Sequence, residues 1–337
     1  MRAGRVPASP PARTIADVGE FGFLARVLPR LTTDSHTIVG PGQDCAVIRS
    51  RTRTLLTVDA LVEGVHFEPG WLSARQLGRK SFLVNASDVA AMGGRPRCCL
   101  ISLGVDPSYP ARALSALQDG IVAAARECGT SVAGGNLTRS EKLFVSVTLL
   151  GDAPPRLVTR QGARPGDHVY VTGWLGDAAL GLRLLRAGAA GGIGRAEAHL
   201  IRRFREPAAR LRAGQSLVNA RIVSAMIDVS DGLIQDLQHI CTESRVGAVL
   251  QAPTVPVSPA YRAIQGGDRS LALSGGEDYE LLCTVPERNV KRLERLQTEL
   301  GCPITCIGQI EPGRGVRVAG ALRPTTGGGG FDHFRKR

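Results

Sequence analysis

Hydrophobic positions along this chain follow two spacings, one typical of helices and one typical of strands. Val290, Leu293, Leu296 and Leu300 fall on one face of a helix. Segments with a helical pattern are residues 74–91, 111–128, 178–187, 196–204, 207–218, 233–243 and 290–300. Short apolar or β-branched runs predict strands at 46–48, 55–58, 98–105, 144–150, 168–172 and 225–227.

Strands and helices mixed in this way predict an α/β (α+β) fold. A chain of 337 residues is long enough for two domains. The segment Gly151 to Pro155 follows the strand at 144–150 and is the best internal boundary. We therefore expect a disordered leader at 1–14, an N-terminal domain at 15–153 and a C-terminal α/β domain at 154–337.

Composition narrows the classes of partner. A net charge of +12 and a pI of about 9.9 are typical of proteins that bind nucleic acid. The arginines are scattered, however, and aromatic residues make up only 4% of the chain. We expect no nucleic-acid partner. No apolar run reaches ~18 residues, so we expect no membrane span. The eight cysteines include no CxxC pair, and we expect them reduced in a cytoplasmic protein.

The most informative stretch is Asp228-Val229-Ser230-Asp231-Gly232-Leu233, which lies between a predicted strand and a predicted helix. An acidic side chain at this position can cap the helix. One carboxylate suffices for a cap, so the second indicates a site for a hard cation.

Three more aspartates occupy comparable positions. Asp44 ends a glycine-containing turn, Asp59 ends the apolar run that starts at Leu55, and Asp88 lies in a mostly apolar segment. Taken alone, each of the three is better explained as a turn or cap residue than as a metal ligand. If the five aspartates converge, their repulsion needs a divalent cation, and oxygen ligands favour magnesium over zinc.

Several segments together resemble one known family. They are Gly19-Glu20-Phe21, Asp59-Ala60-Leu61-Val62-Glu63-Gly64-Val65-His66-Phe67, Val84-Asn85-Ala86-Ser87-Asp88, Gly134-Gly135-Asn136, Asp228-Val229-Ser230-Asp231-Gly232-Leu233 and Ser274-Gly275-Gly276-Glu277-Asp278-Tyr279-Glu280. The chain resembles the thiamine-monophosphate kinase family from about Gly19 to Phe334. The Asp-Val-Ser-Asp-Gly segment alone would indicate only the wider superfamily of aminoimidazole-ribonucleotide-synthetase-like ATP-binding proteins.

The resemblance implies an activity and an assembly. The implied reaction is ATP-dependent phosphorylation of thiamine monophosphate to thiamine diphosphate, in which the substrate phosphate attacks ATP directly. Several Mg²⁺ ions would assist, with no side chain as covalent nucleophile or general base. The implied fold has dimer-forming strands in a mixed-sheet N-terminal domain, with the C-terminal domain packed across a cleft, and the implied assembly is a homodimer.

The resemblance also implies roles for individual residues. The expected metal site comprises Asp44, Thr57, Val58, Asp59, Asp88, Asp228 and Asp231. The expected nucleotide contacts are Gly135, Asn136, Arg160 and Ser230. The expected contacts to thiamine monophosphate are His66, Glu277 and Phe331. The chain departs from the family pattern at Gln43, Val58 and Asn136, and these departures put the metal occupancy in question.

Simpler structural roles remain open for several of these residues. Gly134 to Asn136 can form a β-turn, and Asp177 can cap the helix after Gly173. Lys80 reads as a solvated charge or as an ion-pair partner of the acidic cluster. Two other functions also remain open. One is another ATP-dependent synthetase of the same superfamily, and the other is a non-enzymatic nucleotide-sensing or nucleic-acid-binding protein.

Overall fold

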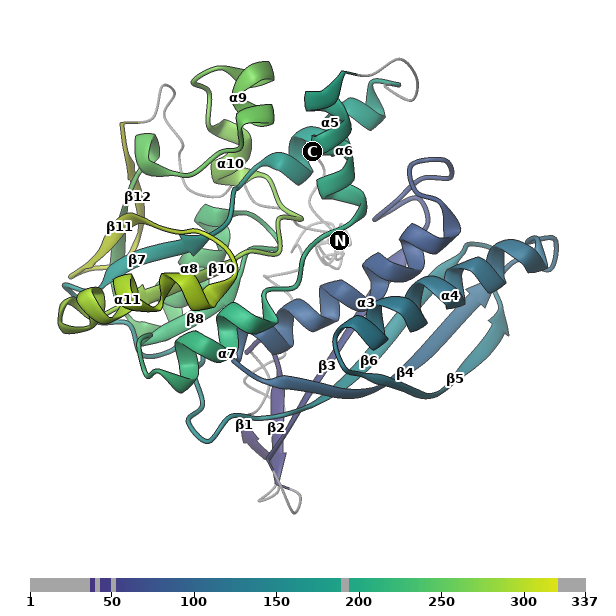
Figure 1. Ribbon diagram of the computed structural model, residues 1–337, viewed down its shortest axis with the longest axis horizontal. Helices are drawn as coiled ribbons and strands as arrows, with labels where there is room; N and C mark the ends of the chain where they lie inside the picture. Colours follow the sequence, from purple (N-terminus) through teal and green to yellow (C-terminus); the bar gives the residue numbers. More distant parts are fainter. Residues whose placement is uncertain (1–36, 40–42, 50–52, 189–193, 321–337) are drawn as a thin grey trace, which may run out of the picture.

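Two six-stranded sheets, one from each half of the chain, form the computed structural model, which describes residues 37–39, 43–49, 53–188 and 194–320 (Figure 1). In each sheet, several strands that lie side by side are not consecutive in the chain. Nearly all neighbouring strands are antiparallel. The mixed α/β fold expected from the sequence is confirmed.

The first sheet has the order β1-β2-β3-β6-β4-β5. Its strands are β1 (Thr37–Val39), β2 (Ala46–Arg49), β3 (Arg53–Val62), β4 (Arg95–Val105), β5 (Ser131–Arg139) and β6 (Phe144–Asp152). Among the described strands of this sheet, only β4 and β5 pair in parallel.

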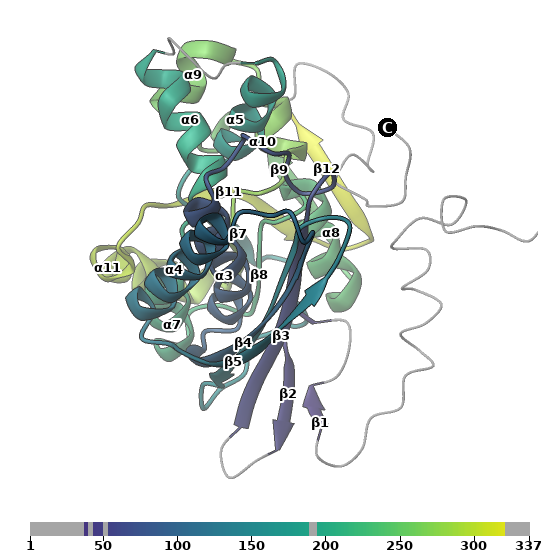
Figure 2. The same ribbon diagram turned by 90° about the vertical axis from the view of Figure 1, so that its right-hand side faces the viewer.

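Helices α3 (Ala74–Ala91) and α4 (Ala111–Glu127) pack side by side on one face of this sheet (Figures 1 and 2). Helix α3 begins at a capping box, in which the Ser73 hydroxyl accepts from Gln76 N and the Gln76 side chain accepts from Ser73 N. Among the described residues, no helix covers the other face, where Val58 and Leu100 are 61% and 47% exposed. The N-terminal sheet therefore has a buried face and an open face.

The second sheet has the order β12-β9-β11-β7-β10-β8. Its strands are β7 (His168–Thr172), β8 (Ala225–Asp228), β9 (Gly247–Gln251), β10 (Leu281–Val285), β11 (Ile304–Glu311) and β12 (Gly315–Ala319). Its helices are α5 (Asp177–Arg186), α6 (Arg195–Arg205), α7 (Leu211–Asn219), α8 (Leu233–Ser244), α9 (Pro259–Gln265), α10 (Ser270–Ser274) and α11 (Val290–Leu300), with short 3-10 turns η2 (Ala252–Thr254) and η3 (Glu287–Asn289).

This sheet has a hydrophobic core on each face. Val171 and Ile227 face a core that includes residues of α5, α6, α8 and α9. Tyr170 and Met226 face a core that includes residues of α7 and α11. Alternating strand residues therefore serve opposite layers, as strand geometry requires.

Helix α3 joins the two halves. It packs on the first sheet and also contacts α7 and β8 of the second half. Ala90 and Ala91 at its end belong to the core that contains Leu217 and Met226. Because α3 is buried by both halves, residues along it can meet side chains from either one.

Most of the predicted elements are present, with small shifts at their ends. Helices α3 and α11 and strand β7 have the predicted bounds. The helix expected from Pro207 begins only at Leu211, and residues 207–210 are not helical. The sequence analysis did not predict β1, β5, β9, β10, β11, β12, α9 or α10. Gly134–Asn136, for which a β-turn was an open reading, lies inside strand β5.

Candidate active site

Three of the five aspartates meet at the junction of the two halves. Asp44 precedes β2, Asp88 lies in the last turn of α3, and Asp228 ends β8. One carboxylate oxygen from each lies within 4.8 Å of the others. The cluster exists only because α3 carries Asp88 to the edge strand of the other half.

Hydroxyl and amide groups hold this cluster in place. Ser87 Oγ donates to Asp228 Oδ2 at 2.6 Å, and Thr57 Oγ1 donates to Asp88 Oδ2. On β3, Asp59 N donates to Asn85 Oδ1 at 3.0 Å, which ties this strand to α3. Thr57 and Asp59 project from the same face of β3, toward α3.

Val58 projects the other way. Its side chain lies on the open face and is 61% exposed, because successive strand residues point to opposite faces. Of the residues expected at a metal, Val58 is therefore the one whose side chain cannot take part, and only its backbone remains available.

The aspartates repel one another in a buried environment. Burial, and then the charges of Asp59, Asp228 and Asp44, raise the pKa of Asp88 well above its usual range. Burial and the charge of Asp44 raise the pKa of Asp228 to about 7. Burial also raises the pKa of Asp44, against the opposing effect of Arg160. The site therefore holds more negative charge than its protein surroundings neutralise.

The donor set suits a hard divalent cation. Asp44 Oδ2 is buried and accepts no hydrogen bond from the described residues, whereas Asp44 Oδ1 accepts from Arg160 Nε at 3.2 Å and from Arg160 Nη2. An orphaned carboxylate oxygen among other carboxylates is what a cation would satisfy. Oxygen-only ligands from Asp44, Asp88 and Asp228 fit Mg²⁺.

Asp231 lies in a second, neighbouring group. One ligand atom each from Asp231, Asp236 and His239 lie within 4.8 Å of one another. Burial, and then the charges of Asp231 and Asp228, raise the pKa of Asp236 well above its usual range. Burial and the charge of Arg160 lower the pKa of His239 to about 4, so this imidazole is neutral near pH 7.

Asp236, rather than Asp228 or Asp231, stabilises the start of α8. Its Oδ2 accepts from Asp231 N at 3.2 Å and from Gly232 N at 3.0 Å. The sequence analysis missed Asp236 and His239. Their spacing of three residues, directly after the predicted acidic turn, places them on one face of the helix and was the available signal.

Arg160 lies between the two halves. Besides its contacts with Asp44, its backbone N donates to Gln43 Oε1 at 3.0 Å. Gln43, a departure from the expected pattern, thus holds the loop that carries Arg160. The side chain expected to reach nucleotide phosphates lies directly beside the acidic cluster.

The loop before β10 packs against the loop after β8. Glu277 N donates to Ser230 O at 2.8 Å, and Tyr279 N donates to Val229 O at 2.8 Å. A Cβ on Gly276 would lie 2.3 Å from Ser230 O, so only glycine allows this approach. Ser230 and Glu277, expected to contact different substrates, are therefore neighbours.

Lys80 pairs with Glu277 across the junction. Its ammonium forms a salt bridge with the Glu277 carboxylate, donates to Phe204 O at 2.9 Å and lies 3.7 Å from the Phe204 ring centroid. The Lys80 side chain is 2% exposed and that of Glu277 is 23% exposed. The reading of Lys80 as a solvated charge is therefore wrong, and its ion-pair partner is Glu277.

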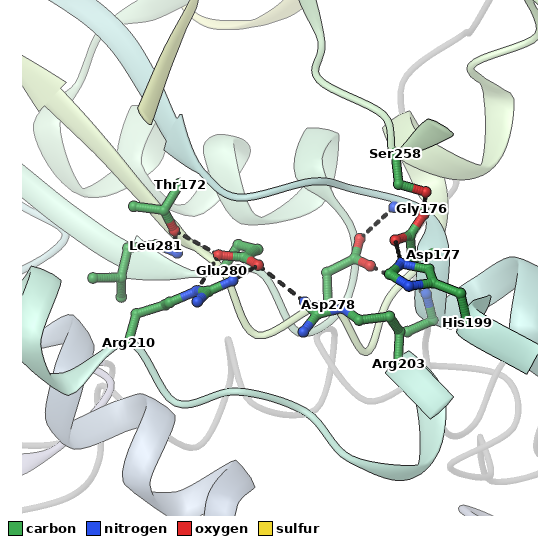
Figure 3. A network of polar contacts seen from close by, with 11 residues as sticks. Thr172, Gly176, Asp177, His199, Arg203, Arg210, Ser258, Asp278, Glu280 and Leu281 are labelled. Carbon is green, nitrogen blue, oxygen red and sulfur yellow. Dashed lines mark hydrogen bonds and ion pairs between the residues drawn. The ribbon is translucent and has the colours of Figure 1, made fainter. Parts of the chain in front are cut away.

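Glu280 anchors a polar network under this loop (Figure 3). Its fully buried carboxylate accepts from Thr172 Oγ1 at 2.8 Å, from Arg203 Nη2 at 3.0 Å and from Arg210 Nε at 2.6 Å. Two guanidinium groups thus neutralise one buried carboxylate, and they link α6 and the residue before α7 to the residue before β10.

The start of α5 is capped by a residue distant in sequence. Asp278 Oδ2 accepts from Gly176 N at 2.8 Å. Asp177 instead binds Ser258 Oγ at 2.7 Å and His199 Nε2 at 3.0 Å (Figure 3). The reading of Asp177 as the helix cap is therefore wrong, because Asp177 is already the first residue of α5.

Gly135 and Asn136 lie apart from the cluster within this chain. They belong to the fully exposed edge strand β5, and Asn136 pairs with Ser102 on β4. Three inter-strand steps, about 14 Å, separate β5 from β3. His66 lies in the turn after β3, where its Nδ1 accepts from Val62 N at 3.0 Å. Phe331 and the preceding glycines lie outside the described residues.

Comparisons with known proteins cover nearly the whole chain. The family models for the AIR synthase related protein N-terminal and C-terminal domains match residues 42–153 and 164–320. The thiamine-monophosphate kinase of Salmonella typhimurium (strain LT2) is 37% identical over 324 residues, which are 94% of this chain and 98% of that protein. That of Escherichia coli (strain K12) is 37% identical over 87% of this chain and 90% of its own length.

Solved structures of similar proteins also match nearly the whole chain. The structure of AaThiL complexed with AMPPCP and TMP matches with a TM-score of 0.85 at 33% identity, covering 96% of this chain and 99% of that one. The thiamine-monophosphate kinase of Stenotrophomonas maltophilia K279a matches with a TM-score of 0.75 at 36% identity, covering 89% and 96%. In the described part of the chain, no helix is long and apolar enough to cross a membrane.

Proposed function

Because this chain belongs to the thiamine-monophosphate kinase family of AIR synthase related proteins, we propose that it transfers the γ-phosphate of ATP to thiamine monophosphate. The products are ADP and thiamine diphosphate. The observation that carries the proposal is the cluster of Asp44, Asp88 and Asp228, assembled from both halves of a chain whose relatives carry out this reaction. A phosphate oxygen of the acceptor attacks the γ-phosphorus, and the bond from that phosphorus to the β,γ-bridging oxygen breaks.

Carboxylates of this chain would hold Mg²⁺ ions at the reacting phosphates. We assign this role to Asp44, Asp59, Asp88, Asp228 and Asp231, with Thr57 and the backbone of Val58 beside them. Bound Mg²⁺ neutralises phosphate charge and aligns donor and acceptor. The orphaned Asp44 Oδ2 and the raised pKa of Asp228 support this assignment.

The remaining roles fall to residues around the cluster. Arg160 would bind nucleotide phosphate, since its guanidinium already lies beside Asp44 and suits bidentate contact with anions. Ser230 would contact the nucleotide. His66, Glu277 and Phe331 would contact thiamine monophosphate, with the aromatic ring stacked on the cationic thiazolium. No side chain need act as general base, because the acceptor phosphate is already largely ionised near neutral pH.

A direct assay tests the reaction. ADP release should depend on thiamine monophosphate and on Mg²⁺, and thiamine without its phosphate should not replace the monophosphate. ADP release that is indifferent to thiamine monophosphate would contradict the proposal. Efficient use of free thiamine, with weak use of the monophosphate, would move the chain to a different class of kinase.

We also propose a homodimer formed through the open face of the first sheet. Val58, Thr148 and Leu100 lie in one row across that face, and Ala60, Ser146, Ser102 and Asn136 lie in the next. An open sheet face with exposed apolar side chains such as Val58 and Leu100 is typical of an interaction surface. In such a dimer Gly135 and Asn136, which lie apart from the acidic cluster of their own chain, would contact the nucleotide of the partner copy.

Domain bounds and location complete the proposal. We place the N-terminal domain at 15–153 and the C-terminal domain at 154–337, since the two sheets fall on either side of this point. We place the enzyme in the cytoplasm. Its eight cysteines are free thiols, which suits a reducing compartment.

A further inference from the structure

Three side chains away from the acidic cluster form a connected set on the second sheet. Cys306 Sγ, on β11, lies 3.9 Å from His168 Nδ1, on β7. His168 Nε2 in turn pairs with the carboxylate of Glu287, in η3. A thiol, an imidazole and a carboxylate therefore follow one another in the order that activates a nucleophile in many enzymes.

The sulfur faces a hollow in the surface. The hollow has a volume of about 260 Å³, and its lining residues are His168, Val249, Gln251, Thr254, Cys306, Gly308 and Gln309. Cys306 is exposed. The pairing of β11 with β7 shifts between Cys306 and Gly308, and such a bulge re-aims side chains at sheet surfaces. A small molecule can therefore reach this thiol.

The neighbours of the sulfur set its chemistry. With Glu287 accepting at Nε2, the neutral imidazole carries its proton there, which leaves the Nδ1 lone pair toward Cys306. Nδ1 can then take the thiol proton, and Glu287 stabilises the resulting imidazolium. Burial and the nearby Cys306 and Cys283 raise the pKa of Tyr170 to about 12, so the Tyr170 hydroxyl stays protonated and can donate to the sulfur.

We propose that Cys306 is a reactive thiol that forms a mixed disulfide with small disulfides of the glutathione type. His168 Nδ1 takes the proton, and the thiolate attacks one sulfur of the disulfide. The Cys306–sulfur bond forms as the sulfur–sulfur bond of the small disulfide breaks. The departing thiolate receives the proton from His168, so the small disulfide is the oxidant and Cys306 is oxidised.

This site is separate from the proposed kinase site. His168 pairs with Val285 at one end of β10, whereas Asp228 of the acidic cluster pairs with Leu281 at the other end, about 13 Å along the strand. Cys306→Ser should therefore leave ADP release unchanged. The two proposals can fail independently, because one is measured as phosphate transfer and the other as thiol modification.

The test uses the full-length chain, reduced and then incubated with glutathione disulfide. Peptide mass mapping over time gives the modification rate of each cysteine. Cys306 should react about tenfold faster than the half-buried Cys98 and Cys302, which serve as internal controls. Buried Cys283, whose pKa burial raises to about 12, should not react. Preferential modification of Cys98 or Cys302 would overturn the proposal.

Two variants separate an activated thiol from one that is merely exposed. His168→Gln should slow modification of Cys306 about tenfold, and Glu287→Gln should slow it about two- to fivefold. The midpoint of the pH dependence of the rate should change in His168→Gln, because the group that takes the thiol proton is absent. Tyr170 and Cys283 are further titratable groups near the sulfur, and Glu294 lies near Tyr170. An unchanged rate and midpoint in both folded variants would overturn the proposal.

Discussion

The hydroxyl of Ser87 donates a 2.6 Å hydrogen bond to the carboxylate of Asp228, and the bond joins helix α3 of the first half to strand β8 of the second. The next residue, Asp88, adds its own carboxylate to the same cluster. Adjacent residues of α3 thus orient one ligand from the other half and supply another. The cluster depends on the docking of the two halves as much as on either half alone.

Removing one charge from the cluster should greatly reduce turnover. We expect Asp88→Asn and Asp59→Asn each to lower kcat by about 10²–10⁴-fold, because a lost carboxylate weakens neutralisation of the transferring phosphate. Asp119→Asn, an exposed change on α4, is the matched control and should keep normal turnover. Near-normal rates in both cluster variants would contradict a metal-binding role.

Stability without divalent cations should fall as pH rises. The pKa values of Asp88 and Asp228 are higher in the folded chain than the ~3.9 of an unfolded aspartate, so the folded chain holds protons that the unfolded chain has released. In EDTA, the contribution of these groups to the free energy of unfolding is therefore fully present below pH ~4. It is lost as pH rises through about 7, the pKa of Asp228.

Thermal melts at pH 5.5 and 7.5 measure this loss. In wild type, the free energy of unfolding should differ between pH 5.5 and pH 7.5. We expect Asp88→Asn to reduce this difference by on the order of 1–3 kcal/mol, since the charge that burial disfavours is gone. Added Mg²⁺ should stabilise wild type more at pH 7.5 than at pH 5.5, because cation and protons compete. An equal effect of Mg²⁺ at both values would argue against binding at these carboxylates.

The Lys80–Glu277 pair should show strong coupling. Lys80→Met should lower the free energy of unfolding by about 2–4 kcal/mol, because Glu277 keeps a largely buried charge without its partner. Lys80→Met with Glu277→Gln should regain much of that loss, since no buried charge is then left unpaired. Urea unfolding of the two single variants and the double variant gives the coupling energy. Additive losses would mean that the contact is not energetically significant.

A charge on the open sheet face should break the dimer. Leu100→Arg puts a guanidinium in the row that Val58 begins, and burying it against a second copy would cost several kcal/mol. Val122→Arg, at a similarly exposed position on α4, is the matched control. Analytical ultracentrifugation should find a dimer for wild type and the control and a monomer for Leu100→Arg. A monomeric wild type would refute this interface.

The sequence pattern was sufficient to predict the bounds of an element where a local signal marked both of its ends. Helix α3 has its predicted bounds because Ser73 and Gln76 form a capping box and Gly93 follows its end. Strand β5 was missed because every one of its residues is exposed and it contains two glycines, so it shows no alternation. Its place in the sheet comes from pairing with β4, which is not visible locally.

Residue types at the site were more predictable than their partners. The acidic turn and the other aspartates could be selected from the residues themselves, whereas Arg160 was selected only through the family resemblance. That Asp44 groups with Asp88 and Asp228 depends on how the halves dock, whereas the group of Asp231, Asp236 and His239 lies within one turn and the helix that follows it. The burial of Lys80 depends in the same way on Glu277 and Phe204, which lie far along the chain.

The number of residues between Lys80 and Asp88 in helix α3 is constrained more strictly than the identity of the residues between them. Lys80 and Asp88 lie eight residues apart, about 12 Å along the axis, and both reach partners in the second half. One inserted or deleted residue between them would turn one relative to the other by about 100°, and only one could keep its contact. Insertions and deletions should therefore be excluded from this stretch even where single substitutions are tolerated, so engineering of this chain should change length only in the loops.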